Sequence, residues 1–238
     1  MARKRRSRHL LQQLTVVALG LATVVTLSTA PANALLLKPT AYGDTGDKPI
    51  IGDWDGVDGD EIGIYRNGVF HLPGYPPLPY GDRDDIPIAG DWNGDGIDTV
   101  GVYRPSTRTF HRLGFSTTIT FGNPGDLPIV GDWNANGSDE LGVYRRSNST
   151  FYMHPDLPPI LYGNPWDLPV IGDWNGGGGV DHIGVYRPDN RTFYPQGQDP
   201  ITYGDPDDQP IAGDWKNTRY DMIGVYRPSN STFYPYLS

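Results

Sequence analysis

The stretch GDWNGDGIDTVGVYR, Gly90 to Arg104, decides the fold, because a version of it occurs five times in the 238-residue chain. Within it, Asp91, Asn93 and Asp95 stand at alternate positions, and a glycine follows where a tight loop needs a positive φ. Oxygen-bearing side chains at the first, third and fifth positions of a loop are typical of a calcium site. Residues 100–103 alternate and are rich in β-branched and aromatic types, which predicts a strand. The pattern therefore predicts a calcium-type loop that joins two strands.

The five copies are evenly spaced. Aligned on the Gly-Asp-Trp triplet, they place their first aspartate at Asp53, Asp91, Asp132, Asp173 and Asp214. The spacings are 38, 41, 41 and 41 residues, and a period near 40 is the length of a four-stranded propeller blade. Each period holds four strand-like segments: Pro-Ile/Val-x-Gly-Asp-Trp, Gly-Val/Ile-Tyr-Arg, a segment centred on Phe, and a segment that ends in an aromatic residue and Gly. The repeat predicts an all-β fold of five blades.

The two ends of the repeat array complement each other. After residue 34 the chain opens with a fourth-type strand, Leu35 to Tyr42, and its last strand, around Phe233, is of the third type. We therefore expect a five-bladed β-propeller over residues 35–238, closed by an N-terminal strand that completes the C-terminal blade. Closure protects the sheet edges, which would otherwise template aggregation. The alternative is an open β solenoid or two-sheet array, which gives the ends no reason to complement each other.

The first 34 residues are predicted to be a signal peptide. A basic start is followed by an apolar segment, Leu14 to Leu27, and by the small-x-small cleavage site Ala32-Asn33-Ala34. A membrane anchor is the alternative, but the apolar run is only about 14 residues long and a membrane span needs about 20. We expect a secreted, extracellular protein with no membrane span after cleavage.

Charge and composition restrict the partners. Five of the 19 Lys and Arg residues and none of the 28 Asp and Glu residues lie in this leader, so the mature chain has a net charge of about −14. Such acidity argues against nucleic acid and anionic membrane surfaces as partners. There is no Cys, so cohesion has to come from packing and ring closure, to which metal can add. The 31 Gly and 23 Pro residues favour turns and strands over helices.

The combined motif carries a resemblance. The series PIxGDW(N/D)GDGxD, GVYRPS and TFY, which covers residues 41–238, resembles the FG-GAP or VCBS-type repeats of secreted bacterial proteins, related in pattern to the integrin alpha-chain propeller. The resemblance implies a β-propeller whose calcium loops join the first and second strands of a blade. This chain departs from the integrin relatives by having five repeats in place of seven. Asp98 also stands at loop position eight, whereas the family usually has Asp at position nine.

Ligand chemistry ranks the five loops as metal sites, with one to four calcium ions expected. The second loop is the best candidate, the third has two neutral amides, and the first and fourth lack a ligand at the fifth position. In the last loop Lys216 and Thr218 replace two ligands, and we expect that loop to be metal-free. The candidate ligands are, loop by loop, Asp53, Asp55 and Asp60; Asp91, Asn93, Asp95 and Asp98; Asp132, Asn134, Asn136 and Asp139; and Asp173, Asn175 and Asp181. The alternative is that the loops are hydrogen-bonded turns, since Asp and Asn accept bonds from nearby backbone N–H groups. The first aspartate, which is present even beside Lys216, is expected to have a structural task as well.

Two other residue types recur in every repeat. The recurring tryptophans, Trp54, Trp92, Trp133, Trp174 and Trp215, are predicted to pack in the core or between blades; sugar platforms are the alternative. The recurring arginines, Arg66, Arg104, Arg145, Arg187 and Arg227, are predicted to pair with carboxylates from blade to blade. A ligand-binding ring of arginines is the alternative.

Trp166 breaks the repeat. It lies in the turn from fourth to first strand, where the other repeats have Gly or Asp. Because strands alternate in direction, this turn shares a face with the second-to-third turns and with the recurring Asp47, Asp85, Asp126, Asp167 and Asp208, opposite the calcium loops. We expect a ligand, such as a sugar, to dock here between the third and fourth blades. Ordinary surface packing is the alternative.

No catalytic constellation is recognisable: there is no Gly-x-Ser-x-Gly elbow, no phosphate-cradling loop and no Cys nucleophile. The sequence therefore predicts a non-catalytic binding (lectin-like) or scaffold module, expected to be monomeric, with a carbohydrate or an extracellular protein as ligand. One alternative is a hydrolase or lyase that acts on extracellular polysaccharide. The other is a cell-envelope structural protein without a ligand.

Overall fold

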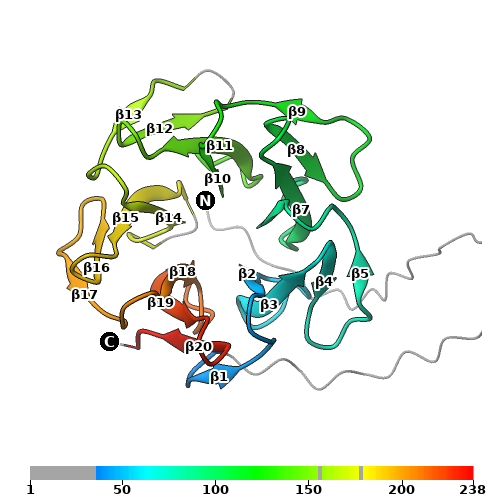
Figure 1. Ribbon diagram of the computed structural model, residues 1–238, viewed down its shortest axis with the longest axis horizontal. Coiled ribbons are helices and arrows are strands. Elements are labelled where there is room, and N and C mark those ends of the chain that lie inside the picture. The colour runs from blue at the N-terminus through cyan, green and yellow to red at the C-terminus, as the bar shows by residue number, and fades with distance from the viewer. Residues whose placement is uncertain (1–35, 155–156, 177–178, 238) are drawn as a thin grey trace, which may run out of the picture. The chain divides into compact units, whose positions relative to one another are not determined.

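The computed structural model describes residues 36–154, 157–176 and 179–237. These residues form twenty β-strands and no helix, and the strands make five antiparallel four-stranded sheets. The sheets are arranged as blades around a common axis (Figure 1). The predicted all-β, five-bladed β-propeller is confirmed. The predicted signal peptide, residues 1–34, lies outside the described residues, and within them no helix has the length and apolar character that a membrane span requires.

Within a blade the first strand is innermost and the second lies next to it (Figure 1). The first strands are β2 (Lys48–Gly52), β6 (Ile86–Gly90), β10 (Leu127–Gly131), β14 (Leu168–Gly172) and β18 (Gln209–Gly213). The second strands are β3 (Glu61–Arg66), β7 (Thr99–Arg104), β11 (Glu140–Arg145), β15 (His182–Arg187) and β19 (Met222–Arg227). The central residues of each second strand are buried, because blades pack on both of its faces.

The third and fourth strands form the outer part of each blade. The third strands are β4 (Val69–His71), β8 (Thr109–Arg112), β12 (Thr150–Met153), β16 (Thr192–Pro195) and β20 (Thr232–Pro235). The fourth strands are β5 (Leu78–Pro79), β9 (Ile119–Thr120), β13 (Ile160–Leu161) and β17 (Ile201–Thr202), and β1 (Thr40–Ala41) takes this place in the blade of β18, β19 and β20. We number the blades 1 to 5 from β2, β6, β10, β14 and β18.

The fourth strands are shorter than the sequence predicts. The segment Leu35 to Tyr42 contributes only Thr40 and Ala41 to the sheet. A proline stands directly before four of the five fourth strands, Pro39 among them. Because proline has no backbone N–H to donate to a neighbouring strand, it marks the start of these strands.

The N-terminal strand lies beside the last strand of the chain. β1 pairs with β20 in antiparallel register, Thr40 opposite Phe233 and Ala41 opposite Thr232. The Tyr42 N–H adds a 2.9 Å bond to the Ser231 carbonyl, directly before β20. Blade 2 has the same bond, from the Phe121 N–H after its fourth strand to the Arg108 carbonyl directly before its third strand. The predicted pairing of the N-terminal strand with the C-terminal blade is therefore present. That this pairing holds the ring closed stays a prediction.

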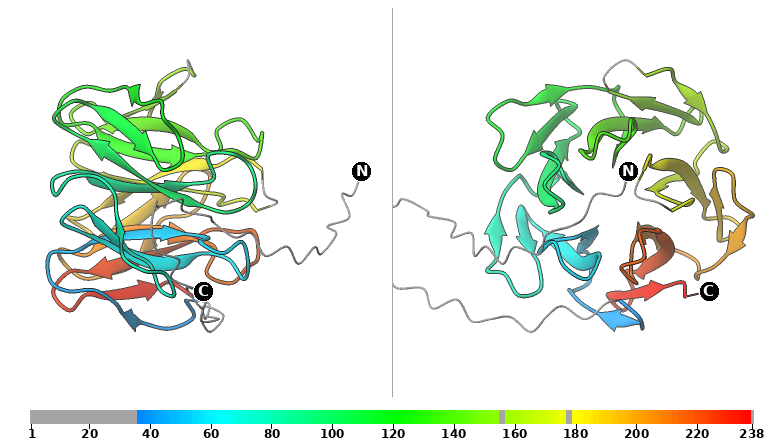
Figure 2. Two further views of the ribbon diagram at one scale, coloured as in Figure 1. Left: turned by 90° about the vertical axis from the view of Figure 1, so that its right-hand side faces the viewer. Right: turned by 180° about the vertical axis from the view of Figure 1, so that it is seen from behind.

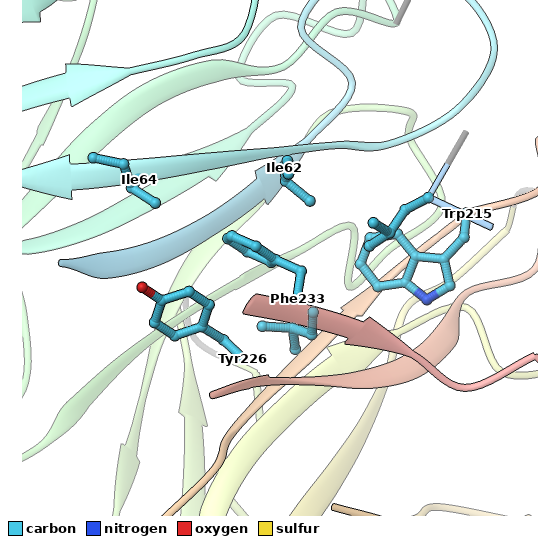
Figure 3. Close-up of a cluster of buried hydrophobic side chains, with 7 residues drawn as sticks. Ile62, Ile64, Trp215, Tyr226 and Phe233 are labelled. Atoms are coloured by element: carbon cyan, nitrogen blue, oxygen red, sulfur yellow. The ribbon is translucent and has the colours of Figure 1, made fainter. Parts of the chain in front are cut away.

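Five equivalent hydrophobic clusters lie between neighbouring blades. Each combines the Trp, Tyr and Phe side chains of one blade with aliphatic side chains from the second strand of the next blade. Figure 3 shows the cluster in which Trp215, Tyr226 and Phe233 of blade 5 pack with Ile62 and Ile64 of blade 1. Blade 5 thus packs on blade 1 as every other blade packs on its successor, and the first strands contact one another around the axis, β18 with β2 included. The five recurring tryptophans are all buried, as predicted.

The recurring arginines pair with carboxylates inside their own blades. Arg104 at the end of β7 donates from Nε and Nη2 to the two oxygens of Asp85, at 3.0 and 2.8 Å. The same two-bond pair joins Arg66 to Asp47, Arg145 to Asp126, Arg187 to Asp167 and Arg227 to Asp208. Each aspartate is buried and precedes the first strand of the arginine's own blade. Pairing with carboxylates is confirmed, but the partner lies within the blade and not across to the next one. Both oxygens of each of these aspartates are therefore already bonded within the blade, which leaves them poorly placed to bond a sugar on that face.

Candidate functional sites: the calcium loops and the Trp166 cleft

The first aspartate of each loop organises the backbone of that loop. In the second loop, Asp91 accepts hydrogen bonds from the N–H groups of Asn93, Gly94, Asp95 and Gly96, at 2.7 to 3.3 Å. In the last loop, beside Lys216, Asp214 accepts bonds from the N–H groups of residues 216, 218 and 219. The predicted structural task of this aspartate is thus present even in the loop expected to be metal-free.

Loop 1 brings three acidic side chains together. Oxygens of Asp53, Asp55 and Glu61 all lie within 4.8 Å of one another. Burial raises the pKa of Asp53 to about 6 against the hydrogen bond from the Gly56 N–H, and the charge of Asp55 adds to the rise. A divalent cation would relieve this repulsion, and three carboxylates are suitable ligands for Ca²⁺. Asp60, the third ligand predicted from the sequence, is not in this group.

Glu61 and Glu140 are residues that the sequence analysis missed. The Trp54 N–H donates to Glu61 at 2.8 Å, and the Trp133 N–H donates to Glu140 at 3.0 Å, so each Glu turns back to its own loop. In loop 3 the amide groups of Asn134 and Asn136 also donate to Glu140. Both Glu residues stand at loop position nine, where the family resemblance places a carboxylate. That position could have identified them from the sequence.

The last aspartate of each loop bonds to the preceding blade. The Asp91 N–H donates to the Asp139 carboxylate at 2.8 Å, and the Asp139 N–H donates back to the Asp91 carbonyl at 2.9 Å. We call this reciprocal pair an aspartate clasp. The other clasps join Asp53 to Asp98, Asp132 to Asp181, Asp173 to Asp221, and Asp214 of blade 5 to Asp60 of blade 1. One oxygen of each of these carboxylates is thereby engaged outside its own loop, and a role for Asp60, Asp98, Asp139 and Asp181 as calcium ligands stays a prediction.

The clasps place five carboxylates around the axis, and we call Asp60, Asp98, Asp139, Asp181 and Asp221 the aspartate ring. Burial is the main cause that raises the pKa of each, to about 7 for Asp139, Asp181 and Asp221 and well above the usual range for Asp60 and Asp98. Charge repulsion adds to it: Asp98 is raised by Asp60 and Asp139, and Asp60 by Asp221. The ring therefore retains protons near neutral pH.

The clasp explains the glycine of the Gly-Asp-Trp triplet. A Cβ on Gly131 would lie 2.9 Å from Oδ2 of Asp181 and 3.0 Å from the indole of Trp133. The other four triplet glycines, Gly52, Gly90, Gly172 and Gly213, would meet the aspartate of the next blade at 2.7 to 2.8 Å. Only glycine leaves room for this carboxylate.

In loop 4 the side-chain amide of Asn175 bonds to Gln198 and His182. The oxygen of Asn175 accepts a bond from Gln198 at 3.1 Å, and its nitrogen lies 3.0 Å from Nε2 of His182. Asp173 accepts a bond from the Gly176 N–H at 2.9 Å. Both polar atoms of the Asn175 side chain, a predicted calcium ligand, are therefore engaged by Gln198 and His182.

Trp166 lies on the face opposite the loops, which we call the turn face. Its side chain is 68% exposed and its φ is +75°. The equivalent residues Gly46, Gly125 and Asp207 also have positive φ, whereas Asp84 does not, so this backbone is common at the turn but not required by it. A bulky residue with positive φ is strained.

A second residue that breaks the repeat contacts Trp166. Arg146 follows the recurring arginine of blade 3, where the other blades have Asn or Pro. Its guanidinium lies over the Trp166 ring at 5.2 Å and donates to the Trp166 carbonyl at 3.0 Å. Together with Asn164, Arg187 and Asp189 the two side chains line a cleft of about 270 Å³. The structure thus places Trp166 between blades 3 and 4, at a cleft with an aromatic surface and polar groups.

Comparison of the chain with protein-family models, curated proteins and solved structures found no match.

Proposed function

We propose that the protein is a secreted calcium-binding β-propeller that acts as a non-catalytic binding module, with a carbohydrate as ligand at the Trp166 cleft. The observation that carries the proposal is the contact between Trp166 and Arg146. Both residues break the repeat, so blade geometry does not explain them, and one of them keeps a strained backbone on an exposed surface. Strain of this kind concentrates at functional sites.

The chemistry of the cleft suits a sugar. An exposed indole ring covers the apolar C–H face of a pyranose, while the guanidinium of Arg146 and the polar groups of Asn164 and Asp189 are placed to bond its hydroxyls. Secretion is supported by the leader pattern of residues 1–34, and membership of the FG-GAP or VCBS-type repeats by the repeat motif.

The test is a glycan array probed with the unchanged protein and with Trp166→Gly. Glycine is the residue found at this turn position in two other blades, so the variant relieves strain while it removes the aromatic surface. We expect it to melt at an equal or higher temperature and to bind at least about 1 kcal/mol more weakly. Asp207→Gly changes the same turn position in the next blade and is expected to leave binding unchanged.

Other outcomes separate the alternatives. Unchanged affinity in Trp166→Gly would place the contact elsewhere, and release of product from a bound glycan would favour the polysaccharide hydrolase or lyase. An array without any binding would count against a carbohydrate ligand and favour an extracellular protein.

Calcium binding is proposed for the loops, with Asp53, Asp55 and Glu61 as the best-supported ligands. A ligand that binds only the folded state stabilises it by about 2.7 kcal/mol at a hundredfold excess over its dissociation constant. Calcium should therefore raise the melting temperature and a chelator should lower it. Glu61→Gln should lose part of this response, whereas Thr218→Ala, in the last loop, should keep it. Equal responses in both variants, or none in the unchanged protein, would mean that the loops are hydrogen-bonded turns.

A further inference from the structure

The Trp166 cleft has walls from two blades. Arg146 comes from the turn between the second and third strands of blade 3, and Asp189 comes from the same turn of blade 4. Trp166 lies in the turn that joins these two blades. Seen edge-on, the strands run from one face of the ring of blades to the other, so these turns share a face (Figure 2). A ligand in the cleft therefore meets an aromatic ring and one charged side chain from each blade.

Arg146 has a free nitrogen for a ligand. Its Nη2 donates to the Trp166 carbonyl at 3.0 Å, and its Nε is buried. Within the described part of the chain, Nη1 forms no hydrogen bond and is not among the buried atoms. The guanidinium also forms no ion pair with any described carboxylate, Asp189 included. Arg146 thus brings to the cleft a positive charge that no carboxylate of these residues neutralises.

Asp189 is a third residue of the cleft that breaks the repeat. The equivalent residue is Ser106 in blade 2, Ser147 in blade 3 and Ser229 in blade 5. Asp189 is exposed, and it too forms no ion pair with a described residue. A carboxylate has two oxygens and accepts hydrogen bonds from adjacent hydroxyl groups. The cleft therefore offers a cation from blade 3 and an acceptor of hydroxyl groups from blade 4.

The turn face is less acidic at blades 3 and 4 than elsewhere. In blades 1, 2 and 5 the recurring arginine pairs with a second, exposed aspartate, at 2.7 to 2.8 Å; these are Asp44, Asp82 and Asp205. Blades 3 and 4 have the neutral Asn123 and Asn164 at this position. Two negative charges are thus absent beside the cleft, which reduces the repulsion of an anion by this acidic chain.

We propose that the Trp166 cleft selects an acidic sugar, whose carboxylate or sulfate group pairs with Arg146 while its hydroxyl groups donate to Asp189. The pyranose ring lies on the indole ring of Trp166. This inference rests on the carbohydrate site proposed above and names its class of ligand. A sugar that covers the cleft removes water from two charges, and this costs free energy unless the sugar supplies partners for both. An acidic sugar supplies an anion for the guanidinium and hydroxyl donors for the carboxylate.

The experiment measures, by calorimetry, the binding of paired oligosaccharides to the unchanged protein. One series contains glucuronate, galacturonate and mannuronate oligomers and the methyl ester of each, which keeps the ring and the hydroxyl groups and removes the charge. The other series pairs sulfated with unsulfated galactose oligomers. At low salt, at least one acidic probe should bind about tenfold more tightly than its neutral counterpart. High salt should reduce this preference. The series that shows the preference identifies the anionic group as a carboxylate or a sulfate.

Variants assign the two charged side chains. Arg146→Gln should weaken the preferred acidic probe about tenfold and leave its neutral counterpart unchanged. Asp189→Ser, which introduces the residue of the other blades, should weaken the neutral counterpart about fivefold, because the hydroxyl groups lose a charged acceptor. Arg83→Gln is the matched control: it removes an exposed positive charge from the fourth-to-first turn of blade 2 and should change neither affinity.

The outcomes separate this inference from the sugar site itself. Equal affinities within every pair, or an unchanged preference in Arg146→Gln, would overturn the inference. If Arg146→Gln does not fold, the pairs measured on the unchanged protein still decide. A neutral glycan that binds more weakly to Trp166→Gly, without any preference for its acidic form, would overturn the inference and leave the sugar site in place. Glycan binding that Trp166→Gly leaves unchanged would remove the site and the inference together.

Discussion

Single residues in the loops carry backbone strain that varies from copy to copy. The sixth loop position has positive φ at Gly96 and Gly137, and also at Arg219 in the last loop, where φ is +66°. A left-handed backbone costs a residue with a Cβ about 1–2 kcal/mol, and glycine avoids that cost. The last loop therefore carries this cost, and so does loop 1, where Asp58 stands at the same position with φ +67°.

Arg219→Gly is expected to stabilise the protein. Because the substitution removes the left-handed strain but adds the chain entropy of glycine, the net gain should be about 0.5–1 kcal/mol in urea unfolding. Gly137→Ala is the reciprocal control: a Cβ there meets nothing within 4 Å, so its expected loss reports strain alone. A stabilising Gly137→Ala would contradict this account of the loops.

The aspartate ring makes stability depend on pH. The pKa values of Asp139, Asp181 and Asp221 are raised to about 7 in the folded state, above the usual value of about 3.9 in an unfolded chain. A group with a raised pKa stabilises the fold fully below the unfolded pKa, and this stability is lost as the pH rises through the folded pKa. In the presence of a chelator, the free energy of unfolding should therefore fall between about pH 4 and pH 7 and level off above.

Asp139→Asn isolates one member of the ring. The amide oxygen can still accept the bond from the Asp91 N–H, but the charge is gone. We expect a gain of about 1 kcal/mol at pH 8 and none at pH 4, measured by thermal or urea unfolding with a chelator. A gain of the same size at both pH values would show that packing, and not charge, is responsible.

At the level of strands, neighbouring blades are joined where the first strand of one blade meets the loop of the next. Gly131→Ala should break the clasp between blades 3 and 4, because the Cβ would lie 2.9 Å from both Asp181 Oδ2 and Ile171 Cγ2. We expect a loss of about 1–3 kcal/mol in the free energy of unfolding. Gly179→Ala, in the loop after β14, meets no described residue within 4 Å and should change little. Equal effects would mean that blade contacts tolerate the extra methyl group.

The sequence predicts the strands well because each blade repeats the same local pattern. β6 and β7 lie within two residues of the segments expected around Trp92 and Tyr103. The fourth strands are the exception, since the two-residue pairing of β1 depends on Pro39 and on the turn that follows, and alternation alone does not show where pairing stops.

The candidate sites were only partly predictable. Trp166 was found because it breaks the repeat. The partner of Asp98 was not predicted. The Asp98 carboxylate accepts a bond from the Asp53 N–H, which lies 45 residues earlier in the sequence and on another blade. The loop pattern assigns such an aspartate to its own loop, and only the packing of blades shows otherwise. Glu61 was overlooked because the adjacent Asp60 stands at loop position eight, the position of Asp98 in the second loop.

For the ring as a complete structure, the pairing of β1 with β20 is the feature to test. Deletion of residues 35–42 removes this strand together with Leu36, which is buried in the cluster of blades 5 and 1. The exposed edge of β20 should cause aggregation and a lower melting temperature. The control is a chain that lacks only residues 1–34. A deletion mutant that stays monomeric with unchanged melting would show that the ring closes without β1.

The clasp between blades 5 and 1 also sets an order of assembly. Its partners, Asp214 and Asp60, are 154 residues apart, whereas 48 residues separate Asp91 and Asp139. Since the entropy of loop closure grows with the logarithm of length, this clasp costs about 1 kcal/mol more to form than the others. Blades should therefore join their neighbours first and the ring should close last. Until then β20 can accept the β1 segment of another copy, so refolding at high protein concentration is expected to yield strand-swapped dimers, detectable by size-exclusion chromatography.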